Sequence, residues 1–274
     1  MEGLLNAVIQ KARESDPDFE APSLGEDIRA LRVKWLNESS GELHLSDGYE
    51  CQLCKNKGFI AKLNEWGEDV TVNCKCQKIR ATLNRAKRSG LGDVLKDFTF
   101  KKYIASDEWQ QNIKLKAQEF CINDQARWFY IGGQVGSGKT HICTAIASHY
   151  IKRGKEVRYM LWAEESKILK AHVGDDIYQE KLGKYKNADV LYIDDFLKTK
   201  QGEEPTSADI NLAFELLNSR LLSKEKITIV SSEKLIGELM DYDEGTMSRV
   251  YDASKPYLFG VDRDRSKNYR LREV

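Results

Sequence analysis

The sequence predicts an α/β fold preceded by a smaller helical segment that carries cysteines. Three observations predict it. A glycine-rich loop lies between an apolar run and a helical run, short apolar runs alternate with helical stretches across residues 128–232, and four cysteines fall within residues 51–76. The 274 residues are enough for two domains. We place these at residues 1–90 and 91–274, with the boundary in the glycine-containing stretch 89–92.

Composition says more about the compartment than about the partner. Lys+Arg and Asp+Glu both number 43, so the net charge favours no class of partner. No apolar run reaches the roughly 18 residues of a membrane span, and the N-terminus carries Glu2 without the basic start of a signal peptide. We therefore expect a cytoplasmic protein without a membrane partner, whose six cysteines are metal ligands or free thiols rather than disulfides.

The glycine-rich loop runs from Gly133 to Thr140 and fits the pattern G-x-x-x-x-G-K-[ST]. The apolar run 129–131 before it predicts a buried strand, and residues 140–153 after it predict a helix. In this context the glycines let backbone N–H groups surround a polyphosphate, and the helix N-terminus adds positive charge. The alternative is a glycine-rich turn without a ligand. The residues predicted to bind ATP are Gly133, Gly136, Ser137, Gly138, Lys139 and Thr140.

Within this loop, Lys139 would contact the β- and γ-phosphates and the Thr140 hydroxyl would bind Mg²⁺. A later apolar run, residues 190–193, ends in the two carboxylates of Asp194 and Asp195. We expect Asp194 to hold the water shell of the same Mg²⁺, and Asp195 to orient or deprotonate the water that attacks the nucleotide. The alternative is a strand end with two solvent-facing acids.

The next predicted strand, residues 227–232, ends in two serines followed by Glu233. A polar residue at this strand end would lie between the nucleotide-binding edges and contact the γ-phosphate. Ser232, or else Glu233, is therefore a predicted catalytic residue; otherwise the serines only cap the following helix. Ahead of the loop, Phe98 and Phe100 would either line an adenine pocket or close the core.

The four cysteines form two close pairs, Cys51-x-x-Cys54 and Cys74-x-Cys76. The stretch between the pairs, residues 58–72, predicts a β-hairpin that would bring them together. Two close cysteine pairs at this spacing predict a tetrahedral Zn²⁺ site with a structural role. The alternative is four reduced, buried thiols, and His44 is a spare ligand.

The residues ahead of the cysteines predict two helices. Apolar side chains recur at helical spacing over residues 1–14, and Ser23 begins a capping box for a helix that ends near Glu38. Their apolar faces either dock a partner or pack on each other and on residues 50–76. Residues 75–102 are rich in lysine and arginine, which predicts either a solvated linker helix or a contact with nucleic-acid phosphates.

Together these pieces resemble the DnaC/DnaI-type replicative helicase loaders, in particular those carried by bacteriophages and prophages. The matching residues are the four cysteines, Gly133–Thr140, Val190–Asp195, Ser231–Glu233, Ser248–Tyr251 and Asp264–Leu271. The resemblance implies an AAA+ ATPase core, in which a parallel sheet with the loop strand at its centre is flanked by helices, without the C-terminal helical lid of most AAA+ proteins. It also implies that Arg249 is an arginine finger, a catalytic residue that completes a slow hydrolysis in the site of a neighbouring copy.

The same resemblance implies a function: an ATP-dependent loader that binds a DnaB-type helicase through its zinc-bearing segment and helps place it on single-stranded DNA. The ATPase domains would self-associate side by side. Three alternatives stay open: a transposition helper ATPase of the IstB type, a non-catalytic adaptor gated by nucleotide, and an inhibitor that caps the helicase. Compared with many AAA+ proteins, Ser232 and Glu233 stand where an Asn is common, and Asp195 replaces a Glu.

Overall fold

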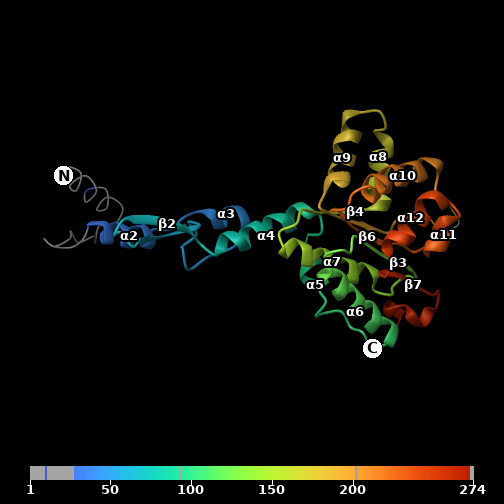
Figure 1. Ribbon diagram of the computed structural model, residues 1–274, viewed down its shortest axis with the longest axis horizontal. Helices are drawn as coiled ribbons and strands as arrows, with labels where there is room; N and C mark the ends of the chain where they lie inside the picture. The colour runs from blue at the N-terminus through green and yellow to red at the C-terminus, as the bar shows by residue number, and fades with distance from the viewer. Residues whose placement is uncertain (1–9, 11–27, 93, 201–202, 272–274) are drawn as a thin grey trace. The chain divides into compact units, whose positions relative to one another are not determined.

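The computed structural model describes Gln10 and residues 28–92, 94–200 and 203–271 (Figure 1). The helix predicted over residues 1–14, apart from Gln10, and the cap predicted at Ser23 lie outside the described residues. No helix in the described part of the chain is long and apolar enough to cross a membrane.

The chain divides into two compact units between Ala81 and Thr82, a point that falls inside helix α4 (Cys76–Ser89). The stretch in which the sequence places the domain boundary, residues 89–92, comes at the end of the same helix. The four cysteines of residues 51–76 thus belong to the first unit, and the glycine-rich loop with both carboxylates belongs to the second.

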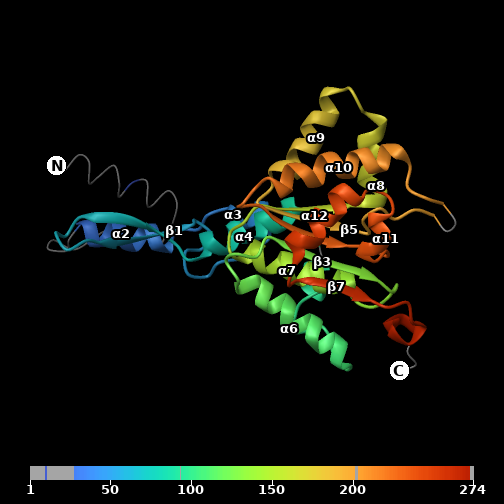
Figure 2. The same ribbon diagram turned by 45° about the vertical axis from the view of Figure 1, so that its right-hand side comes forward.

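The first unit is a β-hairpin with one helix packed against it (Figure 2). Strands β1 (Phe59–Leu63) and β2 (Asp69–Asn73) pair antiparallel, which is the hairpin predicted between the cysteine pairs. Helix α2 (Ile28–Glu38) contacts β1: the Asn37 side chain donates to the carbonyl of Ala61 and accepts from its N–H, both at 2.9 Å. The short helix α3 spans Leu43–Asp47. No side chain of α2 is buried, and the buried cluster of this unit consists of the four cysteines.

The second unit is a parallel sheet with helices on both faces. Its strands are β3 (Trp128–Gly133), β4 (Val157–Leu161), β5 (Val190–Asp194), β6 (Ile227–Ser231) and β7 (Leu258–Val261). They lie in the order β4-β5-β6-β3-β7, and every neighbouring pair is parallel. The loop strand β3 is therefore interior, with β6 on one side and β7 on the other. The predicted α/β fold with a parallel sheet is confirmed.

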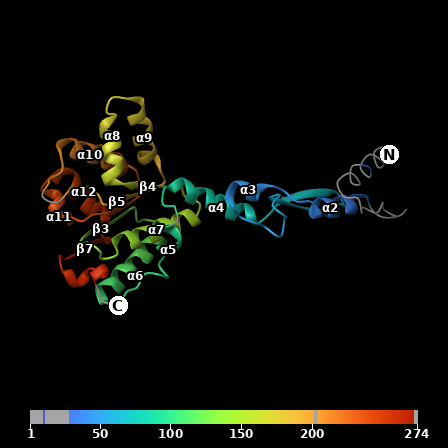
Figure 3. The same ribbon diagram turned by 180° about the vertical axis from the view of Figure 1, so that it is seen from behind.

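Each face of the sheet has its own core, because successive side chains of a strand point to opposite faces. Phe129 and Ile131 pack with α6 (Glu108–Ile122) and α7 (Lys139–Lys152). Trp128 and Tyr130 pack with the helices of the other face. These are α8 (Trp162–Ala171), α9 (Asp176–Asn187), α10 (Ser207–Leu221), α11 (Ile236–Met240) and α12 (Glu244–Ser254). Figure 3 shows the two helical layers from behind.

The last described residues return to the glycine-rich loop. After β7 come two short 3-10 helices, η1 (Arg265–Lys267) and η2 (Tyr269–Leu271), and between α12 and η2 the described chain contains no helical bundle. The Tyr269 N–H donates to the carbonyl oxygen of Gly136 at 2.9 Å. The short helix α5 (Val94–Asp97) contacts α7, the helix that follows the glycine-rich loop.

Candidate nucleotide site and metal centre

The loop between β3 and α7 is packed tightly against its neighbours. Gly133 and Gly136 have φ angles of 108° and 74°, in the left-handed region that favours glycine. A Cβ on Gly136 would lie 1.9 Å from Asn268 Oδ1, and one on Gly133 would lie 2.0 Å from the carbonyl oxygen of Val261. The backbone of Val261 thus leaves no room for a side chain at Gly133, and the positive φ disfavours one at Gly136. Positive φ angles in such a loop let successive backbone N–H groups turn toward an anion.

Lys139, the first residue of α7, is 6% exposed. Its ammonium donates to the carbonyl oxygens of Gly133 at 2.9 Å and of Gln134 at 2.7 Å. Burial lowers the pKa of Lys139, while the nearby carboxylates of Glu233 and Asp195 raise it. The lysine is thus held at the loop, and a phosphate chain would supply the anionic partner that a buried ammonium needs.

Three neighbouring elements, α7, β6 and β4, contribute hydrogen bonds to the carboxylate of Asp194 at the end of β5. Its Oδ1 accepts hydrogen bonds from the Thr140 hydroxyl, at 3.2 Å, and from the Ser231 hydroxyl. Its Oδ2 accepts from the Tyr159 hydroxyl at 3.1 Å, and the residue is only 4% exposed. Thr140 and Asp194, the two predicted Mg²⁺ ligands, are therefore brought together. A hydroxyl beside a carboxylate offers the hard oxygen ligands that Mg²⁺ takes, and water and phosphate oxygens fill its other positions.

Asp195 takes a backbone conformation that non-glycine residues seldom adopt. Its φ is 53°, and that of Leu197, two residues later, is 51°. This turn brings the Lys198 ammonium within 2.9 Å of Asp195 Oδ2. The same ammonium lies 2.8 Å from Glu233 Oε1. The carboxylate predicted to orient the attacking water is therefore paired with a lysine.

Ser232 is fully buried, and its hydroxyl is engaged inside the protein. The hydroxyl donates to the carbonyl of Phe196 at 2.8 Å and accepts from the N–H of Lys234 at 3.1 Å. The side chains of this strand end that reach the site are those of Ser231, which bonds Asp194, and Glu233. The expected contact between Ser232 and the γ-phosphate thus finds no support in this geometry, because adjacent residues of an extended strand end point in opposite directions.

A cavity of about 450 Å³ lies in front of these groups, within the size range of small-molecule sites. It is lined by the loop from Val135 to His141, by Phe98 and Tyr103, by Asp195, Lys198 and Glu233, and by Tyr269 and Arg270. The Phe98 ring stacks on His141, with centroids 4.9 Å apart and planes 18° apart. Phe100 instead packs against the hydrophobic core. Of the two predicted base contacts, Phe98 is the one at the cavity.

Arg249 is exposed on α12 and is not one of the residues that line this cavity. Its Nε donates to the carbonyl of Gly245, one turn earlier, at 3.1 Å. Among the described residues, the predicted arginine finger thus forms its hydrogen bond within its own helix.

The basic stretch 75–102 is partly structural. Arg80 is buried, with Nη1 2.6 Å from Asp47 Oδ2. Arg85 donates to the carbonyl of Ile151 at 3.3 Å. The exposed lysines of the stretch include Lys75, Lys87 and Lys101. Fewer of its charges than the sequence suggested are thus available to a nucleic acid.

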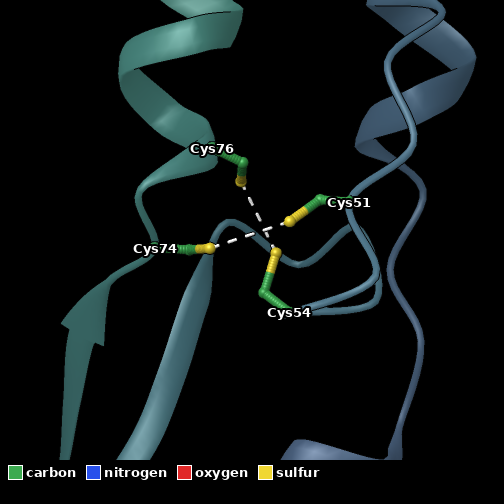
Figure 4. Close-up of side chains that lie close together, drawn as sticks. All are labelled: Cys51, Cys54, Cys74 and Cys76. Atoms are coloured by element: carbon green, nitrogen blue, oxygen red, sulfur yellow. Dashed lines mark hydrogen bonds between the residues drawn. The ribbon is translucent and has the colours of Figure 1, made fainter.

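The four predicted zinc ligands come together in the first unit (Figure 4). The Sγ atoms of Cys51 and Cys74 are 3.8 Å apart, those of Cys54 and Cys76 are 3.5 Å apart, and all four lie within 4.8 Å of one another. Tetrahedral Zn²⁺ with Zn–S bonds of about 2.3 Å requires sulfurs about 3.8 Å apart. All four side chains are buried, so the cluster fits a closed structural site, and His44 is not part of it.

The surroundings favour the thiolate of Cys54 and disfavour those of Cys74 and Cys76. Burial raises the pKa of Cys54, but the Gly58 N–H, 3.3 Å from its sulfur, and the neighbouring thiols lower it to about 7. Burial raises the pKa of Cys76 to about 12, while the Arg80 side chain opposes that rise. Arg80 also donates to Asn56 Oδ1 at 3.0 Å, and this oxygen accepts from the N–H of Cys51 at 2.8 Å. The buried Arg80 guanidinium is thus connected by hydrogen bonds to the loop that holds the first cysteine pair.

Several site residues escaped sequence reasoning. Tyr159 lies two residues before the end of β4, and no motif marks it. His141 and Tyr103 meet edge to face at 5.2 Å beside the loop, although one follows the motif directly and the other lies far upstream. Lys198 follows Asp195 by three residues, a spacing at which a tight turn brings two side chains together. The sequence did not indicate this turn, because its residues with positive φ are not glycines.

The phosphate loop, the strand ending in Asp194 and the parallel sheet define a P-loop ATP-binding protein with the AAA+ fold. Within this class, the sequence profile of the IstB-like ATP binding protein family matches residues 59–243. That range is more than half of the chain, and the chain belongs to this family.

Relatives agree with the resemblance seen in the sequence. The chain is 28% identical over 313 residues to the uncharacterised protein YqaM of Bacillus subtilis (strain 168), covering 96% of this chain and 98% of YqaM. It is 29% identical over 245 residues to the phage-like element PBSX protein XkdC of the same strain, covering 85% and 90%. It is 25% identical over 133 residues to the replicative helicase loader DnaC of Buchnera aphidicola subsp. Baizongia pistaciae (strain Bp), covering 47% and 53%.

Solved structures confirm the fold class. A crystal structure of DnaI superposes with a TM-score of 0.51 at 19% identity, covering 62% of this chain and 92% of that one. A crystal structure of the DnaC helicase loader gives a TM-score of 0.50 at 17% identity, covering 63% and 100%. At these identities the likeness establishes the AAA+ fold.

Proposed function

We propose that this protein is an ATP-dependent loader that binds a replicative DnaB-type helicase and helps place it on single-stranded DNA. The observation that carries the proposal is the Thr140–Asp194 pair at the strand ends of an AAA+ sheet, in a chain that also contains a four-cysteine unit. The Buchnera relative, which is named a replicative helicase loader, supports it. So does the relative named for a phage-like element.

In this proposal the cavity binds ATP, with Phe98 against the base and Lys139 at the β- and γ-phosphates. Mg²⁺, when bound, offsets the charge on the phosphate oxygens. Thr140 and Asp194 would supply the protein's oxygen ligands for the metal, and the hydrogen bond between their side chains supports this role. Asp195 takes the proton of the attacking water, whose oxygen bonds the γ-phosphorus while the bond to the β–γ bridging oxygen breaks; the products are ADP and phosphate.

Arg249 acts in trans, as the arginine finger of a neighbouring copy. Its exposure on α12, outside the cavity of its own subunit, supports this role. The guanidinium would offset the charge that develops on the γ-phosphate, an effect that can be worth about 10³-fold or more in rate. Hydrolysis then depends on the side-by-side association of ATPase domains.

The first unit holds the helicase. Large apolar side chains are exposed across it, including Trp66 at 79%, Leu45 at 74% and Leu53 at 62%. Apolar side chains exposed to this degree would be buried if a partner docked on this unit, and this supports the proposed contact. Zn²⁺ at the four cysteines would keep this surface folded, because the cysteines are the unit's buried cluster.

Single-stranded DNA would contact the ATPase unit through its exposed lysines, including Lys87 and Lys101. Such contacts neutralise phosphates and read little sequence. Binding is then expected to weaken steeply as salt rises.

A loading assay tests the proposal with the full chain. The protein, the DnaB-type helicase of the same genome, Mg·ATP and circular single-stranded DNA are mixed, and the helicase retained on the DNA is measured. Wild-type protein should increase retention, and Lys139→Ala should not. Lys184→Ala is the matched control, because this lysine lies on α9 in an exposed ion pair with Glu180. Failure of the wild-type protein to bind the helicase at all would contradict the loader function.

A transposition helper of the IstB type is the second candidate, because the matching family carries the IstB name. Co-purification with a transposase, and not with the helicase, would favour it. Absence of ATP turnover despite helicase binding would favour the adaptor, and reduced loading in the assay above would favour the inhibitor.

A further inference from the structure

Three charged side chains form a triad, Asp195–Lys198–Glu233, at the rim of the cavity. The Lys198 ammonium lies 2.9 Å from Asp195 Oδ2 and 2.8 Å from Glu233 Oε1. All three residues line the same cavity as Lys139 and Thr140. Their side chains keep exposures of 37% for Lys198, 28% for Asp195 and 31% for Glu233, so a ligand can reach them.

The backbone enforces this triad. Asp195 and Leu197 both have positive φ, a conformation that costs energy and persists only where the surroundings impose it. The buried Phe196 between them is fixed from both sides: its N–H donates to the carbonyl of Ser231 at 2.8 Å, and its carbonyl accepts from the Ser232 hydroxyl at 2.8 Å. The Lys198 N–H then donates to the carbonyl of Asp195 at 3.0 Å. The turn thus directs the lysine back over the carboxylate.

The charges of the triad do not balance, since one cation faces two carboxylates. Burial lowers the pKa of Lys198, but its bonds to Glu233 and Asp195 raise it more, so the lysine stays charged. The same two acids line the cavity beside the phosphate-loop lysine, Lys139. Burial lowers the pKa of Lys139 overall, and the charges of these acids oppose that effect. A terminal phosphate held by Lys139 would therefore arrive beside these acids, and without Lys198 they would repel it.

We propose that Lys198 is the residue through which the site distinguishes a nucleoside triphosphate from a diphosphate. The terminal phosphate competes with Asp195 and Glu233 for the Lys198 ammonium, and this exchange frees the Asp195 carboxylate for the attacking water. A diphosphate, which ends at the β-phosphate, leaves the triad intact. The inference rests on the ATP site of the proposed function, but not on helicase loading.

Binding measurements on the full chain test this role. Dissociation constants for a non-hydrolysable ATP analogue and for ADP, each with Mg²⁺, are compared between wild-type protein and Lys198→Met. We expect the analogue to bind about tenfold or more weakly, which corresponds to one lost charge-assisted hydrogen bond, and ADP affinity to change by less than about threefold. Lys184→Met also breaks an ion pair, with Glu180, and should change neither affinity. Equal losses for both ligands, or no loss for either, would overturn the proposal.

The Glu233→Gln variant tests whether the terminal phosphate displaces the carboxylates from Lys198 or whether the triad is only a structural ion cluster. It removes one of the two carboxylates that compete for Lys198, so the preference for the triphosphate analogue over ADP should rise several-fold, opposite in sign to the effect of Lys198→Met. Lys198→Arg should restore part of the preference. A structural role predicts that both substitutions act in the same direction, and this result would overturn the proposal. If wild-type protein binds neither ligand, the nucleotide site itself fails; if it binds both and the ratio is insensitive to Lys198, only this inference fails.

Discussion

The Tyr159 hydroxyl donates a hydrogen bond to Asp194 Oδ2 at 3.1 Å, so the edge strand β4 orients the carboxylate at the end of its neighbour β5. Thr140 and Ser231 bond the other oxygen of the same carboxylate. Both oxygens are thereby fixed by the protein itself. A partner that orients a metal-binding carboxylate typically changes metal affinity by tenfold or more, which makes Tyr159 open to a direct test.

Replacing Tyr159 by Phe removes this hydrogen bond and little else. We expect the Mg²⁺ concentration needed for half-maximal ATP hydrolysis to rise about tenfold, because the carboxylate loses its orientation. Tyr150→Phe is the control: its hydroxyl makes a long bond of 3.4 Å to the Phe120 carbonyl, on the α7 side of the core. An unchanged Mg²⁺ requirement in Tyr159→Phe would show that the Tyr159 hydroxyl does not orient the Asp194 carboxylate for the metal.

The four-cysteine cluster predicts one Zn²⁺ per chain. Metal analysis of purified protein should find it, and Cys54→Ser should lower the content severalfold, because one thiolate ligand is lost. Cys121→Ala is the matched control, because Cys121 is a buried free cysteine in the hydrophobic core of the second unit and is not part of the four-cysteine cluster. Chelation should destabilise the first unit and leave ATP binding in place. Wild-type protein without zinc would refute the metal centre.

Stability should depend on pH through Asp209, at the start of α10. Its Oδ2 accepts hydrogen bonds from the N–H and the hydroxyl of Thr206, and its Oδ1 lies 2.5 Å from the Lys170 ammonium. Burial raises its pKa, but these partners lower it overall. A depressed folded-state pKa contributes stability above the unfolded value of about 3.9, and this contribution is lost as the pH falls through the lower folded value.

We therefore expect Asp209→Asn to cost about 1–2 kcal/mol of unfolding free energy at pH 7 and progressively less below pH 4. Denaturant unfolding at pH 7 and at pH 3 measures this difference in unfolding free energy. Asp175→Asn serves for comparison, because Asp175 precedes α9 without a side-chain cap hydrogen bond and should cost little at either pH. A cost for Asp209→Asn that stays constant from pH 7 to pH 3 would disagree with the assigned ion pair.

Arg249→Ala should reduce the rate of ATP hydrolysis about a thousandfold and leave ATP affinity unchanged. Arg153→Ala, at the exposed end of α7, should hydrolyse ATP normally. Mixing Arg249→Ala with Asp195→Asn should restore part of the rate, since each variant supplies what the other lacks. Wild-type hydrolysis in Arg249→Ala, with unchanged dependence on protein concentration, would falsify action in trans.

Local patterns made most of the fold predictable. The loop motif with its flanking strand and helix requires only neighbouring residues, and the two cysteine pairs needed only the hairpin between them. Asp194 followed from an apolar strand that ends in a carboxylate. The buried Arg220 had no such signal: it lies on the apolar face of α10 and is satisfied mainly by backbone carbonyls, including those of Ile227 and Ala188.

Two features of the site lay beyond sequence reasoning. Ser231 and Ser232 are chemically identical neighbours, and the pleat of β6 alone decides that Ser231 bonds Asp194 while Ser232 bonds the Phe196 carbonyl. The pairing of Lys198 with Asp195 depends on two positive φ angles at residues that are not glycine. Such conformations are imposed by tertiary contacts, and the residue types at these positions do not predict them.

The account depends most on the phosphate chain lying between Lys139 and Asp194. Calorimetric titration of Mg·ATP into wild-type protein and Lys139→Ala tests it directly, with Lys152→Ala, at the other end of the same helix, as the control. We expect Lys139→Ala to bind Mg·ATP at least about tenfold more weakly, because a buried charge-assisted contact is lost, and Lys152→Ala to bind as wild type does. Equal affinity in wild-type protein and Lys139→Ala would contradict the account.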